Sequence, residues 1–89
     1  MSNEQKLRAE LERGESASRI LNNPLYKEAW DNMEKGLIDN LKQSRPGDTE
    51  IREKIYVALG ILGKLESTFT EVLNTGKMAR VSLDKLTRK

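Results

Sequence analysis

Two short groups of residues have side chains of the types that bind phosphates or cations. Thr75-Gly76-Lys77 matches the last residues of a phosphate-binding loop. Such a loop also needs a glycine five residues before Gly76, a serine or threonine after the lysine, and a strand upstream. Positions 71 and 78 hold Glu71 and Met78, and the preceding segment has helical periodicity. We therefore reject a nucleotide site at this position.

The second group consists of the carboxylates of Asp48, Glu50 and Glu53. Negative side chains at a helix start are stabilised by the helix dipole, and no further ligand converges on these three, so we interpret them as structural. Cysteine and histidine are both absent. Their absence excludes disulfides, Cys or His metal sites, and Ser–His or Cys–His catalysis. We predict no enzyme, no catalytic residue, no cofactor and no metal site.

Positive charge gathers at the C-terminal end, where five basic residues stand against the single acid Asp84. The basic residues are Lys77, Arg80, Lys85, Arg88 and Lys89. Clustered lysine and arginine neutralise phosphates without reading sequence, so this segment is a possible polyanion contact. The whole chain has 16 basic and 14 acidic residues, and no aromatic residue stands among these cations to stack on bases. The favoured interpretation is a basic tail whose cations are solvated or docked on acidic neighbours.

The strongest periodic pattern lies between Thr49 and Thr75. Apolar residues recur there at alternating spacings of four and three, the a/d pattern of a helix that packs along one stripe. We call this set the apolar seam: Ile51, Ile55, Ala58, Leu62, Leu65, Phe69 and Val72. The pattern predicts one long helix over residues 49–75, with Asp48 as its N-cap and Gly76 at the left-handed position after its end.

Two further helices are predicted, over about residues 4–22 and 24–43. The first has a thin apolar stripe that includes Gly14 and Ser18, so it must dock on something to be stable. Asn23 is suited to cap the second helix, with Pro24 at its first position and Trp30 as the packing anchor. The short loop over residues 44–48 favours an antiparallel helical hairpin.

These elements predict an all-α fold. It is a three-helix chain with a helical hairpin and one long helix in its C-terminal half, packed as a bundle or an oligomer. Residues 1–76 would form a single helical domain, and residues 77–89 a basic C-terminal tail. The apolar seam serves either an intramolecular three-helix core or a contact with another subunit. We favour the contact, because the first two helices have thin stripes against a long third helix.

One row on the side of the third helix away from the seam contains two glycines and a serine. Tyr56, Gly60, Gly63 and Ser67 follow spacings of four, three and four. Two glycines in a helix interior cost roughly 2 kcal/mol, which suggests a close-packing notch for another backbone. The structural alternative is that a protein without need for great stability tolerates them.

Several short motifs occur in an order that resembles a known group of proteins. They are Arg13-Gly14, Ile20 to Leu25, Glu28-Ala29-Trp30, Asp48-Thr49-Glu50, Arg52-Glu53-Lys54 and Thr75-Gly76-Lys77. The chain resembles small, largely uncharacterised helical proteins that tailed bacteriophages encode near virion-structure and packaging genes. The resemblance covers roughly residues 10–79. It implies a setting in the bacterial host cytoplasm, with incorporation into the virion as a further option, and it brings no catalytic residues.

The sequence therefore leads us to expect a non-enzymatic, helical assembly or interaction protein of bacteriophage origin. It would self-associate as a homo-oligomer or dock on a larger structural or packaging protein, and we expect no membrane contact because no stretch approaches a membrane span. The first alternative is a small nucleic-acid-binding accessory protein that uses the basic tail. The second is a host-directed inhibitor that presents the long helix to a bacterial protein.

Overall fold

The computed structural model describes residues 2–88, and three α-helices account for almost all of them. They are α1 (Asn3–Leu21), α2 (Pro24–Gln43) and α3 (Thr49–Thr87). The described residues contain no strand, so the predicted all-α class is confirmed. At 1.5 Å per residue α3 is roughly 58 Å long. It therefore runs almost the whole length of a molecule that measures 65 × 24 × 18 Å.

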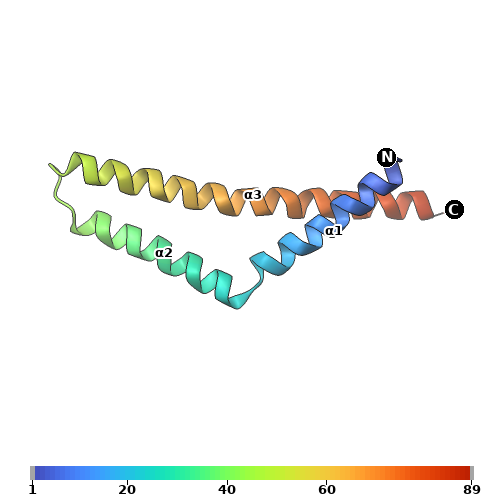
Figure 1. Ribbon diagram of the computed structural model, residues 1–89, viewed down its shortest axis with the longest axis horizontal. Helices are drawn as coiled ribbons and strands as arrows, with labels where there is room; N and C mark the ends of the chain where they lie inside the picture. Colours follow the sequence, from blue (N-terminus) through green and yellow to red (C-terminus); the bar gives the residue numbers. More distant parts are fainter. Residues whose placement is uncertain (1, 89) are drawn as a thin grey trace.

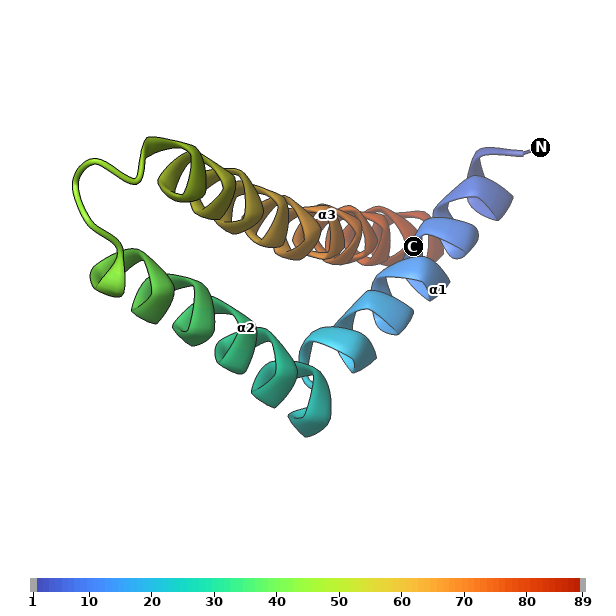
Figure 2. The same cartoon turned by 60° about the vertical axis from the view of Figure 1, so that its left-hand side comes forward.

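The two shorter helices lie along α3 one after the other. In Figure 1, α2 faces the N-terminal half of α3, and α1 crosses its C-terminal half. Figure 2 shows the same arrangement from a second direction, with the α1–α2 junction projecting away from α3. The chain therefore forms an α2–α3 hairpin with α1 folded across the far end of α3. This open arrangement leaves much of each helix without a neighbour.

Local capping residues set where the first two helices begin. Ser2 and Gln5 form a capping box, in which each side chain accepts a hydrogen bond from the other residue's backbone N–H at 3.2 Å. Asn23 Oδ1 accepts hydrogen bonds from the backbone N–H groups of Leu25 and Tyr26, at 2.9 and 3.1 Å. The predicted second helix, with Pro24 at its first position, is confirmed at both ends.

Asp48 occupies the predicted N-cap position of α3. Its side chain, however, makes no capping hydrogen bond to the helix. Its carboxylate instead accepts a hydrogen bond from the backbone N–H of Arg45 at 2.9 Å and so closes the turn before α3. Arg52 donates a hydrogen bond to Ser44 Oγ at 2.8 Å. This contact ties the first turns of α3 to the end of α2.

The predicted end of the third helix at Thr75 is wrong, and so is the basic tail over residues 77–89. α3 continues to Thr87, and none of the described glycines has a positive φ. Gly76 is buried inside the helix against α1 rather than in a left-handed cap. The apolar spacing of the seam also continues through Gly76, Ala79 and Leu83. The predicted domain boundary at residue 76 therefore falls inside α3, because α1 packs on the helix there.

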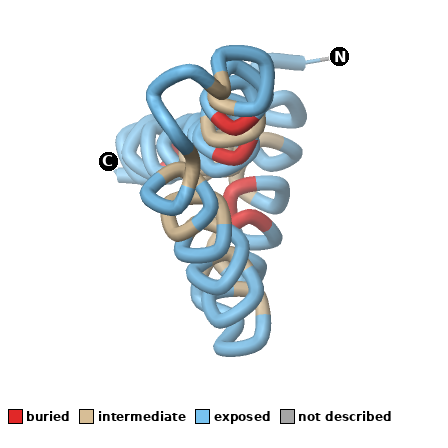
Figure 3. The backbone as a smooth tube through the Cα atoms, turned by 90° about the vertical axis from the view of Figure 1, so that its left-hand side faces the viewer, coloured by how far each residue is buried: buried red, intermediate tan, exposed pale blue. Residues whose placement is uncertain are grey.

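The core is a narrow strip along α3. Among residues 2–88, five apolar residues are buried: Ala17, Ile55, Leu62, Ala79 and Leu83. The four in α3 all fall on the seam and its continuation, and α2 contributes no buried residue. Figure 3 colours the buried residues red, the buried glycines among them, and most of the backbone is exposed. The chain therefore buries one line of residues and leaves the rest of its apolar surface open.

Candidate protein interaction surface

The seven residues of the apolar seam differ in how far the chain itself covers them. Ile55 and Leu62 are buried, at 7% and 5% exposed, and Ala58, Phe69 and Val72 are half-buried. Ile51 and Leu65 are 55% and 46% exposed. The seam is therefore part of the intramolecular core, but its covering is incomplete.

The C-terminal half of α3 is covered by α1 at a close helix crossing. A Cβ added at Gly14 would lie 2.7 Å from the Cα of Gly76 and 3.3 Å from the carbonyl oxygen of Val72. Beside this contact, the guanidinium of Arg80 lies 3.3 Å from the carboxylate of Glu15. Both side chains are largely exposed, so the pair adds little to stability. The crossing depends on the two glycines.

Two aromatic residues of α2, Tyr26 and Trp30, contact α3. The rings of Tyr26 and Phe69 meet edge to face, with centroids 6.0 Å apart and an interplanar angle of 88°. The indole N–H of Trp30 donates a long hydrogen bond of 3.4 Å to the backbone carbonyl of Leu62. Trp30 thus contacts the buried centre of the seam, as expected of a packing anchor. The hydroxyl of Tyr26 is buried and finds no hydrogen-bond partner among the described residues.

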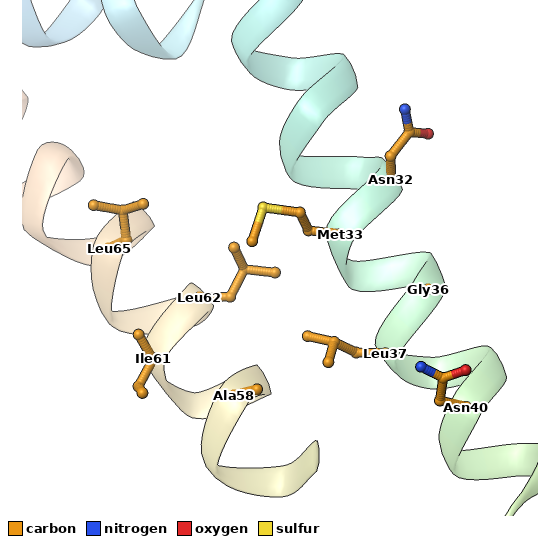
Figure 4. A pocket seen from close by; sticks show the side chains of 9 residues that line it. All are labelled: Asn32, Met33, Gly36, Leu37, Asn40, Ala58, Ile61, Leu62 and Leu65. Atoms are coloured by element: carbon orange, nitrogen blue, oxygen red, sulfur yellow. The ribbon is translucent and has the colours of Figure 1, made fainter. Parts of the chain in front are cut away.

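An apolar groove opens between α2 and α3 on one side of the hairpin. Its volume is about 490 Å³. We call it the α2–α3 groove, and its lining residues are Asn32, Met33, Gly36, Leu37 and Asn40 of α2 and Ala58, Ile61, Leu62 and Leu65 of α3. Figure 4 shows Met33, Leu37 and Leu62 pointing toward one another across it. Three residues of the seam, Ala58, Leu62 and Leu65, belong to this lining, and Leu65 is the one that stays exposed.

The groove has a buried floor and exposed apolar edges. Leu62 forms the floor, while Met33, Ile61 and Leu65 are 59%, 66% and 46% exposed. Gly36 widens the α2 side, because a Cβ added there would meet nothing within 4 Å. None of the 9 lining residues is charged, although 34% of the residues in the chain are. Depletion of charge around a contiguous apolar patch is typical of the centre of a protein interface.

Sequence analysis identified only part of this groove. It placed the lining residues Ala58, Leu62 and Leu65 on the seam. It missed Ile61, which follows Val57 and precedes Leu65 at spacings of four and so extends an apolar row beside the seam. Gly36 also lines the groove, and no sequence pattern pointed to it. The spacing of four from Val57 to Ile61 and from Ile61 to Leu65 is the sequence pattern that could have identified the groove.

The row of residues predicted to form a close-packing notch lies on the outer surface of α3. A Cβ added at Gly60 or Gly63 would meet nothing within 4 Å. Tyr56 is 56% exposed, and Ser67 is exposed with its hydroxyl donating to the Lys64 carbonyl at 3.0 Å. No other part of residues 2–88 packs between these positions. The notch therefore stays a prediction about a contact outside this chain.

The basic residues predicted for polyanion contact belong to α3 rather than to a tail. Lys77, Arg80 and Lys85 lie within the helix, and Arg88 is its C-cap residue. Arg80 is paired with Glu15, and Lys77, Lys85 and Arg88 are exposed. Lys89 lies outside the described residues. The polyanion contact therefore stays a prediction, now for the last turns of a helix rather than for a tail.

The acidic group at the start of α3 separates into different roles. Glu50 forms an exposed pair with Lys54 at 3.3 Å, and Asp48 closes the preceding turn. Across residues 2–88, no three metal-ligating side chains come close enough together to hold an ion. Within the same residues, every helix is too short or too polar to cross a membrane.

Comparison of the chain with protein-family models, with curated proteins and with solved structures finds no match. The resemblance to small helical phage proteins therefore stays a prediction. What is known of the site comes from its geometry: an uncharged apolar groove next to a partly covered seam.

Proposed function

We propose that this chain is a non-enzymatic assembly protein that buries apolar helix surface against helices of another subunit. The subunit is a further copy of the chain or a larger structural component. The observation that carries the proposal is the α2–α3 groove with its exposed edge residues Met33, Ile61 and Leu65. Three large exposed apolar side chains beside an uncharged groove form the kind of surface that marks a protein interaction site.

The exposed surface of the chain supports this proposal. A folded monomer of 10.2 kDa is expected to expose roughly 5,300 Å². This chain exposes 6998 Å², so the excess is roughly 1,700 Å² against that expectation. An elongated chain exposes more surface than a compact one, and this excess is larger than the roughly 800 Å² that a standard interface takes from each partner.

The shape of the chain supports the same proposal. Its radius of gyration is 18.9 Å, whereas a compact domain of this length has about 12 Å. The elongation results from α3, which extends past both shorter helices and is covered by each over only part of its length. A long helix covered on one side offers its other sides to neighbours, which suits assembly.

The proposed setting comes from the sequence resemblance alone. Small helical proteins of tailed bacteriophages would be made in the bacterial host cytoplasm and would act during virion assembly or genome packaging. Within that setting, the chain would act through contact with other subunits rather than through a reaction. The groove gives such a protein a defined contact surface.

The first test is the solution mass of the chain by light scattering, at low and at high salt. We expect a discrete oligomer that persists at high salt, because apolar contacts are not screened by ions and are strengthened by many salts. A single species of 10.2 kDa in both conditions would contradict self-association. An oligomer that dissociates at high salt would contradict an apolar contact.

A further inference from the structure

We propose that the occupant of the α2–α3 groove is the same groove of a second copy, so that two α2–α3 hairpins pack face to face as a symmetric dimer. This inference rests on the proposed assembly function and names its partner and its surface. Each copy would insert the edge residues Met33, Ile61 and Leu65 against the floor of the other. The product is a four-helix contact made from two identical hairpins.

The shape of the groove supports a self-complementary contact. Its edges carry protruding side chains from both helices, and its middle recedes to Leu62 and to the backbone of Gly36. With a two-fold axis beside one edge of the groove, that edge of each copy lies over the middle of the other, so one patch supplies both halves of the interface.

The charge distribution favours a second copy over a strongly charged partner. The lining supplies only apolar side chains, the glycine and two asparagines, so it offers no charge to pair with an acidic or basic ligand. The chain carries a net charge of only +2, so two copies repel one another weakly. On the opposite side of the hairpin, the hollow beside Trp30 includes Lys27, Asp31 and Glu66. The α2–α3 groove, in contrast, combines apolar edges with an uncharged lining.

The area available also fits one further copy. A stable interface of standard size takes about 800 Å² from each partner. The excess surface of roughly 1,700 Å² belongs to the whole chain, and it leaves room for one such contact. The dimer would also give α2, which contributes no buried residue in the single chain, a second packing partner. Burial of Met33 and Ile61 in this way converts exposed apolar surface into core.

The test compares two exposed apolar residues of α3, one in the groove and one outside it. Ile61→Lys places a charge on the groove edge, while Met78→Lys places the same charge at a residue that is 71% exposed and does not line the groove. Met33→Lys repeats the test from the α2 edge. Sedimentation velocity gives the mass of each variant, and circular dichroism shows that each is still helical.

We expect the wild-type chain and Met78→Lys to be dimers, and Ile61→Lys and Met33→Lys to be helical monomers. The dissociation constant should rise about 100-fold or more, because a symmetric contact buries the new charge twice. If the wild type is an oligomer and both groove variants keep its mass, assembly uses another surface and this inference is wrong while the assembly function stands. A monomeric wild type would contradict both the dimer and the self-association on which it rests.

Discussion

Gly14 of α1 lies against Gly76 of α3 so closely that a methyl group added at Gly76 would sit 2.7 Å from the Gly14 Cα. The same addition would stand 3.1 Å from the Glu10 carbonyl oxygen. Real Cβ atoms do not approach backbone atoms so closely, and helix backbone yields less readily than a flexible side chain. The two glycines therefore let the two backbones meet directly where α1 crosses α3.

This contact predicts that Gly14→Ala destabilises the protein. Alanine favours a helix over glycine by about 1 kcal/mol, but overpacking at the crossing should outweigh this gain. We expect the free energy of unfolding to fall by about 1–3 kcal/mol. Chemical denaturation followed by circular dichroism measures it, with every variant at one protein concentration because oligomers gain apparent stability by mass action.

Gly60→Ala is the matched control for that variant. It makes the same change in an interior helical position, and the new Cβ would meet nothing within 4 Å. We expect it to raise the free energy of unfolding by about 1 kcal/mol through helix propensity alone. A gain of stability from Gly14→Ala similar to that from Gly60→Ala would contradict the close crossing.

The misplaced end of the third helix shows where sequence reasoning stopped short. Gly76 follows a long helical stretch, and glycine commonly ends helices, so a C-terminal role was the local expectation. The spacing of four and three nevertheless continues from Val72 through Gly76, Ala79 and Leu83. Local propensity cannot distinguish a helix-ending glycine from one that admits another backbone, because the second role depends on a residue in a different helix.

Other features were predictable because they are local. Asn23 and Pro24 define the start of α2 through side-chain capping and a fixed φ, and both are visible in the sequence. The seam was visible as a periodicity, and its buried members Ile55 and Leu62 lie at its centre. Which seam positions stay exposed depends on which part of α3 is covered by α1 and which by α2. The spacing of apolar residues in the sequence gives no information about this.

The exposure of individual seam residues predicts unequal effects of a buried charge. Leu62→Asp should abolish folding or assembly, because Leu62 is 5% exposed and an unpaired carboxylate there would be desolvated. Ile51→Asp, at a seam residue that is 55% exposed, should change the free energy of unfolding by less than about 1 kcal/mol. Circular dichroism and solution mass distinguish them. A soluble, fully helical Leu62→Asp protein of unchanged mass would contradict the central role of Leu62.

The buried hydroxyl of Tyr26 predicts a stabilising substitution. Tyr26→Phe keeps the ring that meets Phe69 edge to face and removes a hydroxyl that has no partner among the described residues. Unsatisfied buried polar groups cost about 1–3 kcal/mol, so we expect a gain of about 1 kcal/mol in the free energy of unfolding. Tyr56→Phe, on the exposed side of α3, should leave it unchanged within about 0.5 kcal/mol. Equal effects at the two tyrosines would show that the Tyr26 hydroxyl is satisfied.

The continuation of α3 to Thr87 predicts that its last turns are needed for the fold. A chain that ends at Gly76 loses the buried residues Ala79 and Leu83 and the Arg80–Glu15 pair. Loss of the Leu83 burial alone removes about 1.5–3 kcal/mol. A chain that ends at Lys85 keeps all three contacts and serves as the control.

We expect the chain that ends at Gly76 to unfold at a markedly lower temperature than the chain that ends at Lys85. For a domain of this size, a loss of 2 kcal/mol lowers the melting temperature by about 8–16 °C. Hydrogen exchange should also show that the amides of α1 lose protection, because α1 packs on the deleted part of α3. If the two truncated chains melt together and α1 stays protected, residues 77–85 are dispensable and the crossing of α1 over α3 does not hold the fold together.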